Sequence, residues 1–496
     1  MTLGAGRQPA TRPKAGRANG KRAQRVFWVL LYLVFPLIIM PKALLEWIPG
    51  VTFPAQGFAE VLIPKLIVLA VLWGLAARIC WLLWRAGDLT LLSRASPLRQ
   101  PFAWLGLFLT ASLVVSLLNP APLGLNLPLI DDRYESVLFR VLEVAWYALT
   151  FLTAGLGASR VLKLSWILHL MALGASLTGG WALLEAYGIN PLRLIDANAS
   201  IGNNLNATMG HQSYVAAFVA VVLVFWVAWR LLLRRVRVLD GAIIAFLTAC
   251  LVATGGRAGL LAAIGALSVL ALIWFRQERR APPRYILLLG SLMIVAAGMP
   301  LLTSPHAQLR LGKLGSAVEG EDPATSHRVI FWQVGIKAIT QRPLTGYGID
   351  AFGNAAWFFA TPEQAEEMLT EFLPRRIAER TLRLGNLALY RAADSGVLEL
   401  QPVKPYRVHN YFLDLAFASG IPVLLLFIGF VLTTAWTLLQ SGTPIALATF
   451  LALTTYLIYG MVWFATPNVD PLVWGLVGLG LGTCWKGQAV EGAHSA

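Results

Sequence analysis

The chain of 496 residues is 57% hydrophobic and only 13% charged, with a mean hydropathy of +0.65 and a formal net charge of +15. This balance excludes an ordinary soluble globular domain. A basic excess of this size is typical of nucleic-acid-binding proteins, but the places of the basic residues, given below, argue against a polyanionic partner. We therefore expect an integral membrane protein.

Apolar runs long enough to cross a bilayer recur along most of the chain. A hydrocarbon core of about 30 Å requires ~20 apolar residues per helix. The predicted fold class is an all-α polytopic integral membrane protein with about twelve transmembrane helices and a large helical outer loop before the last three. The predicted spans are 27–43, 58–84, 102–118, 137–158, 164–187, 212–234, 238–254, 258–275, 285–302, 410–439, 443–465 and 470–486.

These spans divide the chain into five segments. We expect a disordered basic tail at 1–25, nine transmembrane helices at 26–302, an outer loop domain at 303–409, three further helices at 410–486 and a short tail at 487–496. The three cysteines all fall within spans, so a disulfide framework or a cysteine-ligated zinc site is not expected.

Basic residues mark one side of the membrane. Threaded through twelve spans, the basic tail and the basic short connections all fall on the side of the N-terminus, and the positive-inside bias makes that side the cytoplasm. Both termini are then cytoplasmic, and most of the net charge is explained without nucleic acid. The residues are Arg7, Arg12, Lys14, Arg17, Lys21, Arg22, Arg25, Arg94, Arg99, Arg160, Lys163, Arg234, Arg235, Arg237, Arg276, Arg279, Arg280 and Arg284.

The outer loop is predicted to be mostly helical. Apolar residues recur at helical spacing over 363–384, and Thr361-Pro362-Glu363 is a good helix start. Such amphipathic helices can lie against the bilayer as a lid. The clusters of glutamate and arginine in the outer loop are either solvent-exposed helix faces or, at Arg375 and Arg376, a binding site for an anionic lipid headgroup. A further helix is predicted from Arg328 to about Arg342.

Three ionisable side chains are predicted within the bilayer, near its outer end. Lys65 follows a proline in the second span, while Arg140 and Glu143 lie three residues apart on one face of the fourth and can pair. Two interpretations stay open for them: structural pairing and snorkelling, or the lining of a polar, substrate-binding cavity.

The glycine-rich turn 254–259 carries Arg257 on the outer side, where positive-inside bias disfavours it. Arg257 either snorkels to lipid phosphates or holds a phosphate of a ligand, because glycines permit close backbone approach and guanidinium binds phosphate in a bidentate manner. Arg328 and His409 lie on the same side, and the pKa of histidine suits it to take a proton from a hydroxyl. Asn410 beside it is a substrate-binding candidate.

These residues point to a site for a phosphorylated lipid and an alcohol acceptor. No metal site is predicted, because the outer acidic residues show no Asp-x-Asp or comparable spacing. No cofactor is predicted either.

The sequence resembles the O-antigen ligase superfamily, which includes lipid A-core ligases, O-antigen polymerases and bacterial protein O-oligosaccharyltransferases. The order and shared sidedness of four segments carry the resemblance, which extends over most of residues 100–485. The segments are Gly210-His211-Gln212-Ser213-Tyr214, residues 254–261, Arg328 to Trp332 with 343–348, and residues 409–413 leading to Gly420-Ile421-Pro422.

The resemblance implies a metal-independent, inverting glycosyltransferase of the bacterial inner membrane, acting at its periplasmic face. The donor would be a glycan on undecaprenyl pyrophosphate and the acceptor a hydroxyl of lipid A-core or a comparable molecule. Arg257 and Arg328 would hold the pyrophosphate and stabilise the leaving group. His409 would be the general base, and His211 and Gln212 would bind sugar or phosphate.

Three alternatives stay open: a polymerase that extends the glycan on its own carrier, a protein O-oligosaccharyltransferase, and a transporter of lipid-linked glycans. A transporter typically shows inverted repeats and paired broken helices. Only the break at Gly420-Ile421-Pro422 is of that kind, and the first half of the chain offers no partner for it. Besides donor and acceptor, membrane lipid is the expected partner.

Overall fold

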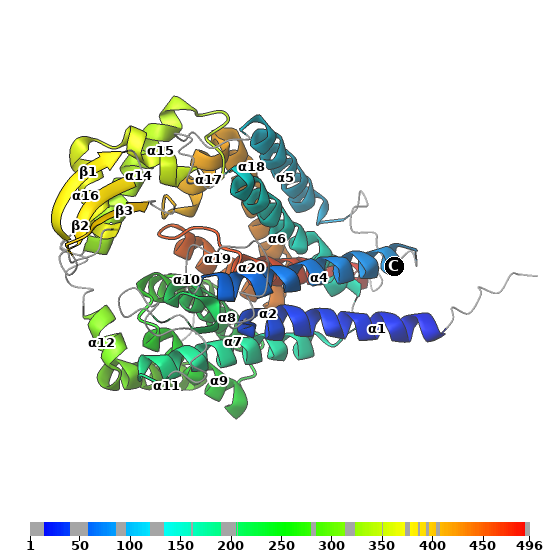
Figure 1. Ribbon diagram of the computed structural model, residues 1–496. Helices are drawn as coiled ribbons and strands as arrows, with labels where there is room; N and C mark the ends of the chain where they lie inside the picture. The colour runs from blue at the N-terminus through cyan, green and yellow to red at the C-terminus, as the bar shows by residue number, and fades with distance from the viewer. Residues whose placement is uncertain are drawn as a thin grey trace, which may run out of the picture.

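The computed structural model describes most of the chain and is almost entirely helical (Figure 1). The residues described are 14–39, 58–85, 96–119, 133–159, 162–189, 205, 207–278, 284–312, 323–349, 351–372, 377–384, 387–392, 396–402 and 407–491. Helical segments lie in each of the twelve predicted spans.

The bundle is built from helices of the N-terminal and C-terminal parts. They are α1 Lys14–Val29, the π-helical η1 Leu30–Val34, α2 Phe35–Leu37, α4 Phe58–Arg85, α5 Arg99–Leu118, α6 Arg133–Ser159, α7 Leu164–Ala186, the 3-10 turn η3 Ala207–Met209, α8 Gln212–Leu232, α9 Val238–Ala253, α10 Arg257–Glu278, α11 Arg284–Thr303, α17 Tyr411–Ser419, α18 Ile421–Ser441, α19 Pro444–Gly460 and α20 Asp470–Glu491.

The remaining elements belong to the outer loop. They are α12 Pro305–Leu311, α14 Pro323–Gln341, α15 Phe352–Phe359, α16 Pro362–Phe372, β1 Ile377–Leu384, β2 Leu387–Ala392 and β3 Leu398–Pro402. In Figure 1, α12, α14 to α16 and the strands lie at one end of the molecule, and α1 runs toward the opposite end, where the C-terminus also lies.

Seven helices in the described part of the chain are long and apolar enough to cross a membrane. They are Ile63–Leu82, Arg99–Leu118, Leu164–Ala186, Gln212–Leu232, Arg257–Arg276, Ile286–Thr303 and Ile421–Ser441, and α9 and α19 are shorter apolar helices. The prediction of a polytopic membrane protein is thus confirmed in this form. The count of twelve spans and their orientation stay predictions.

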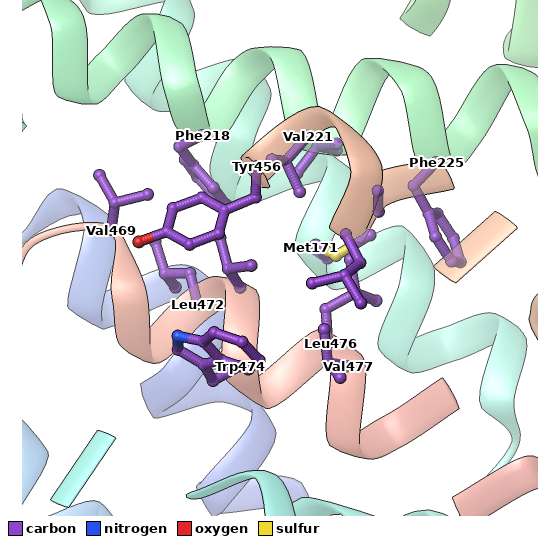
Figure 2. Packing of buried hydrophobic residues seen from close by; sticks show 14 of the residues in the cluster. Met171, Phe218, Val221, Phe225, Tyr456, Val469, Leu472, Trp474, Leu476 and Val477 are labelled. Carbon is purple, nitrogen blue, oxygen red and sulfur yellow. The ribbon is translucent and has the colours of Figure 1, made fainter. Parts of the chain in front are cut away.

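Helix α8 forms the centre of the bundle. Every residue from Gln212 to Leu231 is buried, because α7, α9, α10 and α19 pack around it. A helix that is apolar on all sides is typical of such a central position. Figure 2 shows Phe218, Val221 and Phe225 of α8 along one side of the buried cluster and Trp474, Leu476 and Val477 of α20 along the other, with Tyr456 of α19 between the two helices.

The predicted tenth span is two helices joined at Gly420. Gly420 has a φ of +85°, and a Cβ there would meet the carbonyl of Leu344, so only glycine is compatible with the contact. Ile421 N donates to Pro343 O (2.7 Å), and Tyr347 N donates to Phe417 O (2.9 Å). The segment that follows α14 is thereby fixed to the junction of α17 and α18.

The basic tail is partly helical, contrary to the prediction of disorder through residue 25. Helix α1 begins at Lys14, and residues 1–13 lie outside the described part. Alanine, lysine, arginine and glutamine are good helix formers, and α1 runs through them into the apolar segment that follows. At the other end, α20 continues to Glu491, past the predicted boundary at 486.

The outer loop also contains a sheet where helix was predicted. Helix α16 begins at Pro362 as expected, and Thr361 and Gln364 cap each other reciprocally. However, β1, β2 and β3 form an antiparallel sheet in which Leu384 pairs with Leu387. The prediction of helix over 363–384 was wrong beyond Phe372, because the helical spacing of apolar residues holds only over 363–372. Residues 382–390 alternate leucine with other residues around Gly385-Asn386, which is typical of a hairpin.

Helices α6 and α20 pack closely through glycines of α20. A Cβ on Gly478 would meet the side chain of Thr153 and the carbonyl of Thr150. Small residues allow helix backbones to approach in this way in membranes.

Replacing Gly478 with alanine should therefore lower the thermal stability of the purified protein, by about 1–3 kcal/mol as for other overpacked sites. Gly290→Ala in α11 is the matched control, because nothing lies within 4 Å of its Cβ position. The control should be neutral or stabilised by about 0.5–1 kcal/mol. Equal melting temperatures for both variants in detergent would contradict the close packing.

Candidate functional site

A cavity of about 320 Å³ lies where six segments far apart in the sequence meet. These are the start of α8, the α9–α10 turn, α12, α14, the residue pair before α17 and the segment after α19. Five of the predicted site residues therefore lie on one cavity. Its lining residues are His211, Gln212, Ser213, Gly255, Gly256, Arg257, Ala258, Arg310, His327, Arg328, Phe331, His409 and Trp463.

The lining carries positive charge. Among the described lining residues are the arginines Arg257, Arg310 and Arg328 and no carboxylate. No group of three or more His, Cys, Asp or Glu side chains placed to hold a metal ion occurs in the described ranges. The charge of the cavity suits an anionic ligand, and guanidinium groups match phosphate oxygens.

Glycines of the α9–α10 turn place Arg257 beside α8. Gly255 has a φ of +60°, which glycine adopts without strain. A Cβ on Gly256 or Gly259 would collide with Ala216 of α8. Because these glycines let α10 begin against α8, Arg257 at the first position of α10 lies next to the start of α8.

His211 caps α8 and has a defined tautomer. Its Nδ1 accepts a hydrogen bond from Ser213 N (3.1 Å), so Nδ1 carries no proton and the neutral ring is protonated on Nε2. The ring stacks on Trp463, with centroids 5.3 Å apart and an interplanar angle of 27°. His211 can therefore donate a hydrogen bond from Nε2.

Arg310 is positioned by the same turn. A Cβ on Gly255 would lie 2.7 Å from Cβ of Arg310, so the glycine allows α12 to pack against the turn. His306, one turn earlier on the same face of α12, donates from Nε2 to Thr254 O (3.2 Å) and fixes the helix to this turn. The short helix α12 thus brings a third arginine to the cavity.

Helix α14 brings Arg328 to the wall formed by the segment after α19. The guanidinium carbon of Arg328 lies 5.4 Å from the ring centroid of Trp463, a cation–π distance. Trp332 Nε1 on the same helix donates to His409 O (3.2 Å). Arg328 and His409 are therefore held at a fixed spacing by α14.

His409 has an unusual backbone conformation, with a φ of +58°. Left-handed backbone is costly for a residue other than glycine and is found preferentially at functional sites. Nδ1 of His409 lies 2.9 Å from Arg407 O. Because a carbonyl oxygen only accepts, Nδ1 carries the proton, and Nε2 of the neutral ring is left with a lone pair.

A buried ion pair anchors the segment that carries His409. Arg407 donates to Asp414 (3.1 Å), and Val408 N donates to the other carboxylate oxygen of Asp414 (3.4 Å). Asn410 accepts from two backbone N–H groups at the start of α17 and donates to Met461 O (2.8 Å). These contacts hold the backbone on both sides of His409.

His211 and His409 are both neutral in the free protein. Burial, and then the charge of Arg328, lower the pKa of His409 to about 3; its ring is enclosed by Phe331, Trp463 and Phe464. Burial, Arg310 and Arg328 lower the pKa of His211 to about 4. At neutral pH the cavity therefore combines arginine cations with His211, whose Nε2 can donate a hydrogen bond, and His409, whose Nε2 can accept one.

Four predicted substrate-binding residues do not line the cavity. Lys65 donates to Ile38 O (3.0 Å) and Thr208 O (2.8 Å). Arg140 pairs with Glu143 and donates to the hydroxyl of Ser419 (2.6 Å), which is the structural pairing considered above. Asn410 serves as the cap just described, and Arg375 and Arg376 lie outside the described residues.

The sequence did not single out Arg310, His327, Phe331 or Trp463, although all line the cavity. Arg310 lies in a short segment after the ninth span and carries no spacing signal relative to the other arginines. Trp463 ends an apolar run and is indistinguishable from an interfacial tryptophan. Arg310 is identified only by its contact with Gly255, and Trp463 only by its ring contacts with His211 and His409.

Comparison with known families gives one match. Residues 242–428 match the family described as O-antigen ligase, and this region contains Arg257, Arg310, Arg328 and His409. The resemblance read from the motifs is thus confirmed, and members of this family are membrane glycosyltransferase-like enzymes. No curated protein matches the chain significantly.

His409 should stay reactive toward diethyl pyrocarbonate, which modifies neutral imidazole, down to acidic pH. N-acetylhistidine, with a pKa of about 6.5, loses about tenfold in reactivity between pH 7.5 and 5.5. His409 has a pKa of about 3 and should lose almost none. Peptide mass spectrometry measures the rates; a parallel fall for His409 and the reference compound would contradict a lowered pKa. Arg328→Gln should raise the pKa, because it removes the second cause of the shift.

Proposed function

We propose, on the premise that residues 242–428 belong to the O-antigen ligase family, that the protein transfers a glycan from undecaprenyl pyrophosphate to an acceptor hydroxyl. The reaction takes place at the periplasmic face of the bacterial inner membrane, and the preferred acceptor is lipid A-core or a comparable glycolipid. The observation that carries the proposal is the cavity that Arg257, Arg310 and Arg328 line together with His409, whose Nε2 is unprotonated.

The arginines bind the pyrophosphate of the donor. A lipid-linked sugar pyrophosphate carries two negative charges, and the pyrophosphate released after transfer carries a third ionisable oxygen. Arg257 and Arg328 hold the donor, and Arg310 adds a third cation for the charge that develops as the bond breaks. Fixed cations in a partly enclosed cavity need no metal ion for this task, so the proposed mechanism is metal-independent.

His409 is the general base. Its Nε2 accepts the proton of the acceptor hydroxyl while the hydroxyl oxygen forms a bond to the anomeric carbon. The bond from that carbon to the pyrophosphate oxygen breaks, its electron pair leaves with the pyrophosphate, and the anomeric configuration inverts. The pyrophosphate counteracts the effect of Arg328, so donor binding raises the pKa of His409 toward the range of an effective base.

His211 complements His409 across Trp463. Nε2 of its neutral ring carries a proton and can donate to a phosphate or sugar oxygen, while Gln212 beside it offers an amide. Together they orient the donor, so that only the acceptor hydroxyl meets the lone pair of His409.

The second candidate is a polymerase of the same superfamily, in which the acceptor is another lipid-linked glycan. The same cavity, arginines and base can perform that reaction, and the family match does not distinguish the two activities. Protein O-glycosylation differs again only in the acceptor. A transporter, by contrast, breaks no bond and has no use for a histidine whose tautomer and backbone are held for proton transfer.

His409→Ala should lower transfer by roughly 10²–10⁴-fold, the usual contribution of a general base, and leave binding of undecaprenyl pyrophosphate intact. Purified protein is assayed with lipid-linked glycan donor, with and without EDTA. His169→Ala, which changes an exposed histidine of α7, is the control and should transfer normally. Wild-type turnover in His409→Ala would remove His409 as the base, and strict dependence on divalent ions would contradict the metal-free mechanism.

The same assay separates the acceptors. Product formed only with lipid A-core supports the ligase, a ladder of longer lipid-linked glycans without added acceptor supports the polymerase, and glycosylated protein supports the third activity. Binding of the donor without any product in the three arms would contradict the enzyme and favour transport.

A further inference from the structure

A second cavity, of about 340 Å³, lies at the opposite end of the bundle. It is enclosed by α1, α6, α7, α19 and α20 and shares no lining residue with the first cavity. Ile445 at the start of α19 lines it, whereas Trp463 lies just beyond the other end of that helix. Because α19 has 17 residues, and each rises about 1.5 Å, the two cavities lie near opposite faces of the membrane.

The wall of this second cavity offers hydrocarbon rather than hydrogen bonds. Gln24 is buried and donates to Ser159 Oγ (3.2 Å). Thr443 caps α19, and the hydroxyl of Thr483 donates to a backbone carbonyl of its own helix (2.6 Å). The remaining lining residues are glycine and aliphatic. A cavity of this kind excludes water and accepts an apolar chain.

Positive charge lies beside the apolar wall. Lys163 is exposed and stands between Leu162 and Leu164, both of which line the cavity. Lys163 is also the N-cap of α7, and its side chain makes no capping hydrogen bond. The N-terminal N–H groups of α7 and the ammonium group therefore favour an anion at the same place.

Helix α1 adds a second lysine. Lys21 is exposed and lies three residues before Gln24, so both are on one face of the helix. The helical structure of α1 at these residues, unexpected from the sequence, fixes Lys21 on the side of the cavity.

We propose that this second cavity binds a phospholipid with an anionic phosphodiester headgroup, such as phosphatidylglycerol. Part of one acyl chain occupies the apolar space, and the phosphate lies at the start of α7 between Lys163 and Lys21. The volume is at the lower end of the range of about 300–1,000 Å³ found for small-molecule pockets, which suits one chain and not a bulkier glycolipid. The site is independent of the proposed transfer reaction.

Native mass spectrometry of the full-length protein, titrated with phosphatidylglycerol or with phosphatidylcholine of the same chains, tests the proposal. We expect each protein to bind one molecule of phosphatidylglycerol more tightly than phosphatidylcholine. Lys163→Gln should weaken its binding about fivefold, as for loss of one basic residue near a charged headgroup, and leave phosphatidylcholine unchanged. Leu162→Trp, which fills the cavity, should weaken both lipids.

Two control variants separate the general effect of losing a basic residue or adding a bulky one from an effect at the cavity. Arg284→Gln removes an exposed basic residue of α11, and Leu288→Trp enlarges a residue on its surface that is 70% exposed. Neither should change lipid binding. Equal binding of the two lipids, or variants at the cavity that behave as these controls do, would overturn the proposal. Binding of glycerol phosphate alone would overturn the role of the acyl chain, and stronger binding of undecaprenyl phosphate would overturn the phospholipid as occupant.

Discussion

The candidate active site depends on the close approach of α10 to α8. Gly256 and Gly259 leave no room for a Cβ against Ala216, and this contact sets Arg257 beside the histidine that caps α8. A second close contact, at Gly420, fixes the segment after α14 to the end of α17. Close backbone contacts that only glycine permits therefore join the four motif segments in two pairs, and these contacts set the places of the charged side chains.

The electrostatics of the cavity follow from that arrangement. Burial, and then the neighbouring charges of Arg310 and Arg328, lower the pKa of His211, and burial and Arg328 lower the pKa of His409. Both side chains therefore stay neutral and keep the tautomers that their backbone partners select. In the proposed mechanism, an anionic donor offsets the charge of Arg328 and so raises the pKa of His409. Donor binding would thereby make His409 a stronger base.

The sequence was sufficient for the class of protein and for most of the cationic site. Its apolar periodicity predicted the helices, and the order of the motifs led to Arg257, Arg328 and His409, because short motifs lie at helix ends where topology restricts their position. The sequence did not predict Arg310 and Trp463 as site residues, because their positions at the cavity depend on tertiary packing. Lys65, Arg140 and Glu143 were chosen for their charge within the membrane, but each has a protein partner that satisfies it away from the cavity. The sheet at 377–402 was missed because amphipathic helix and strand patterns overlap over short ranges.

The most direct test is a structure of the protein determined with undecaprenyl pyrophosphate, for example by cryo-electron microscopy. We expect pyrophosphate density in the first cavity, in contact with Arg257, Arg310 and Arg328 and within hydrogen-bond distance of His211. Density for the pyrophosphate at another place, such as beside Lys65 or at the start of α7, with the first cavity vacant, would contradict the proposed donor site.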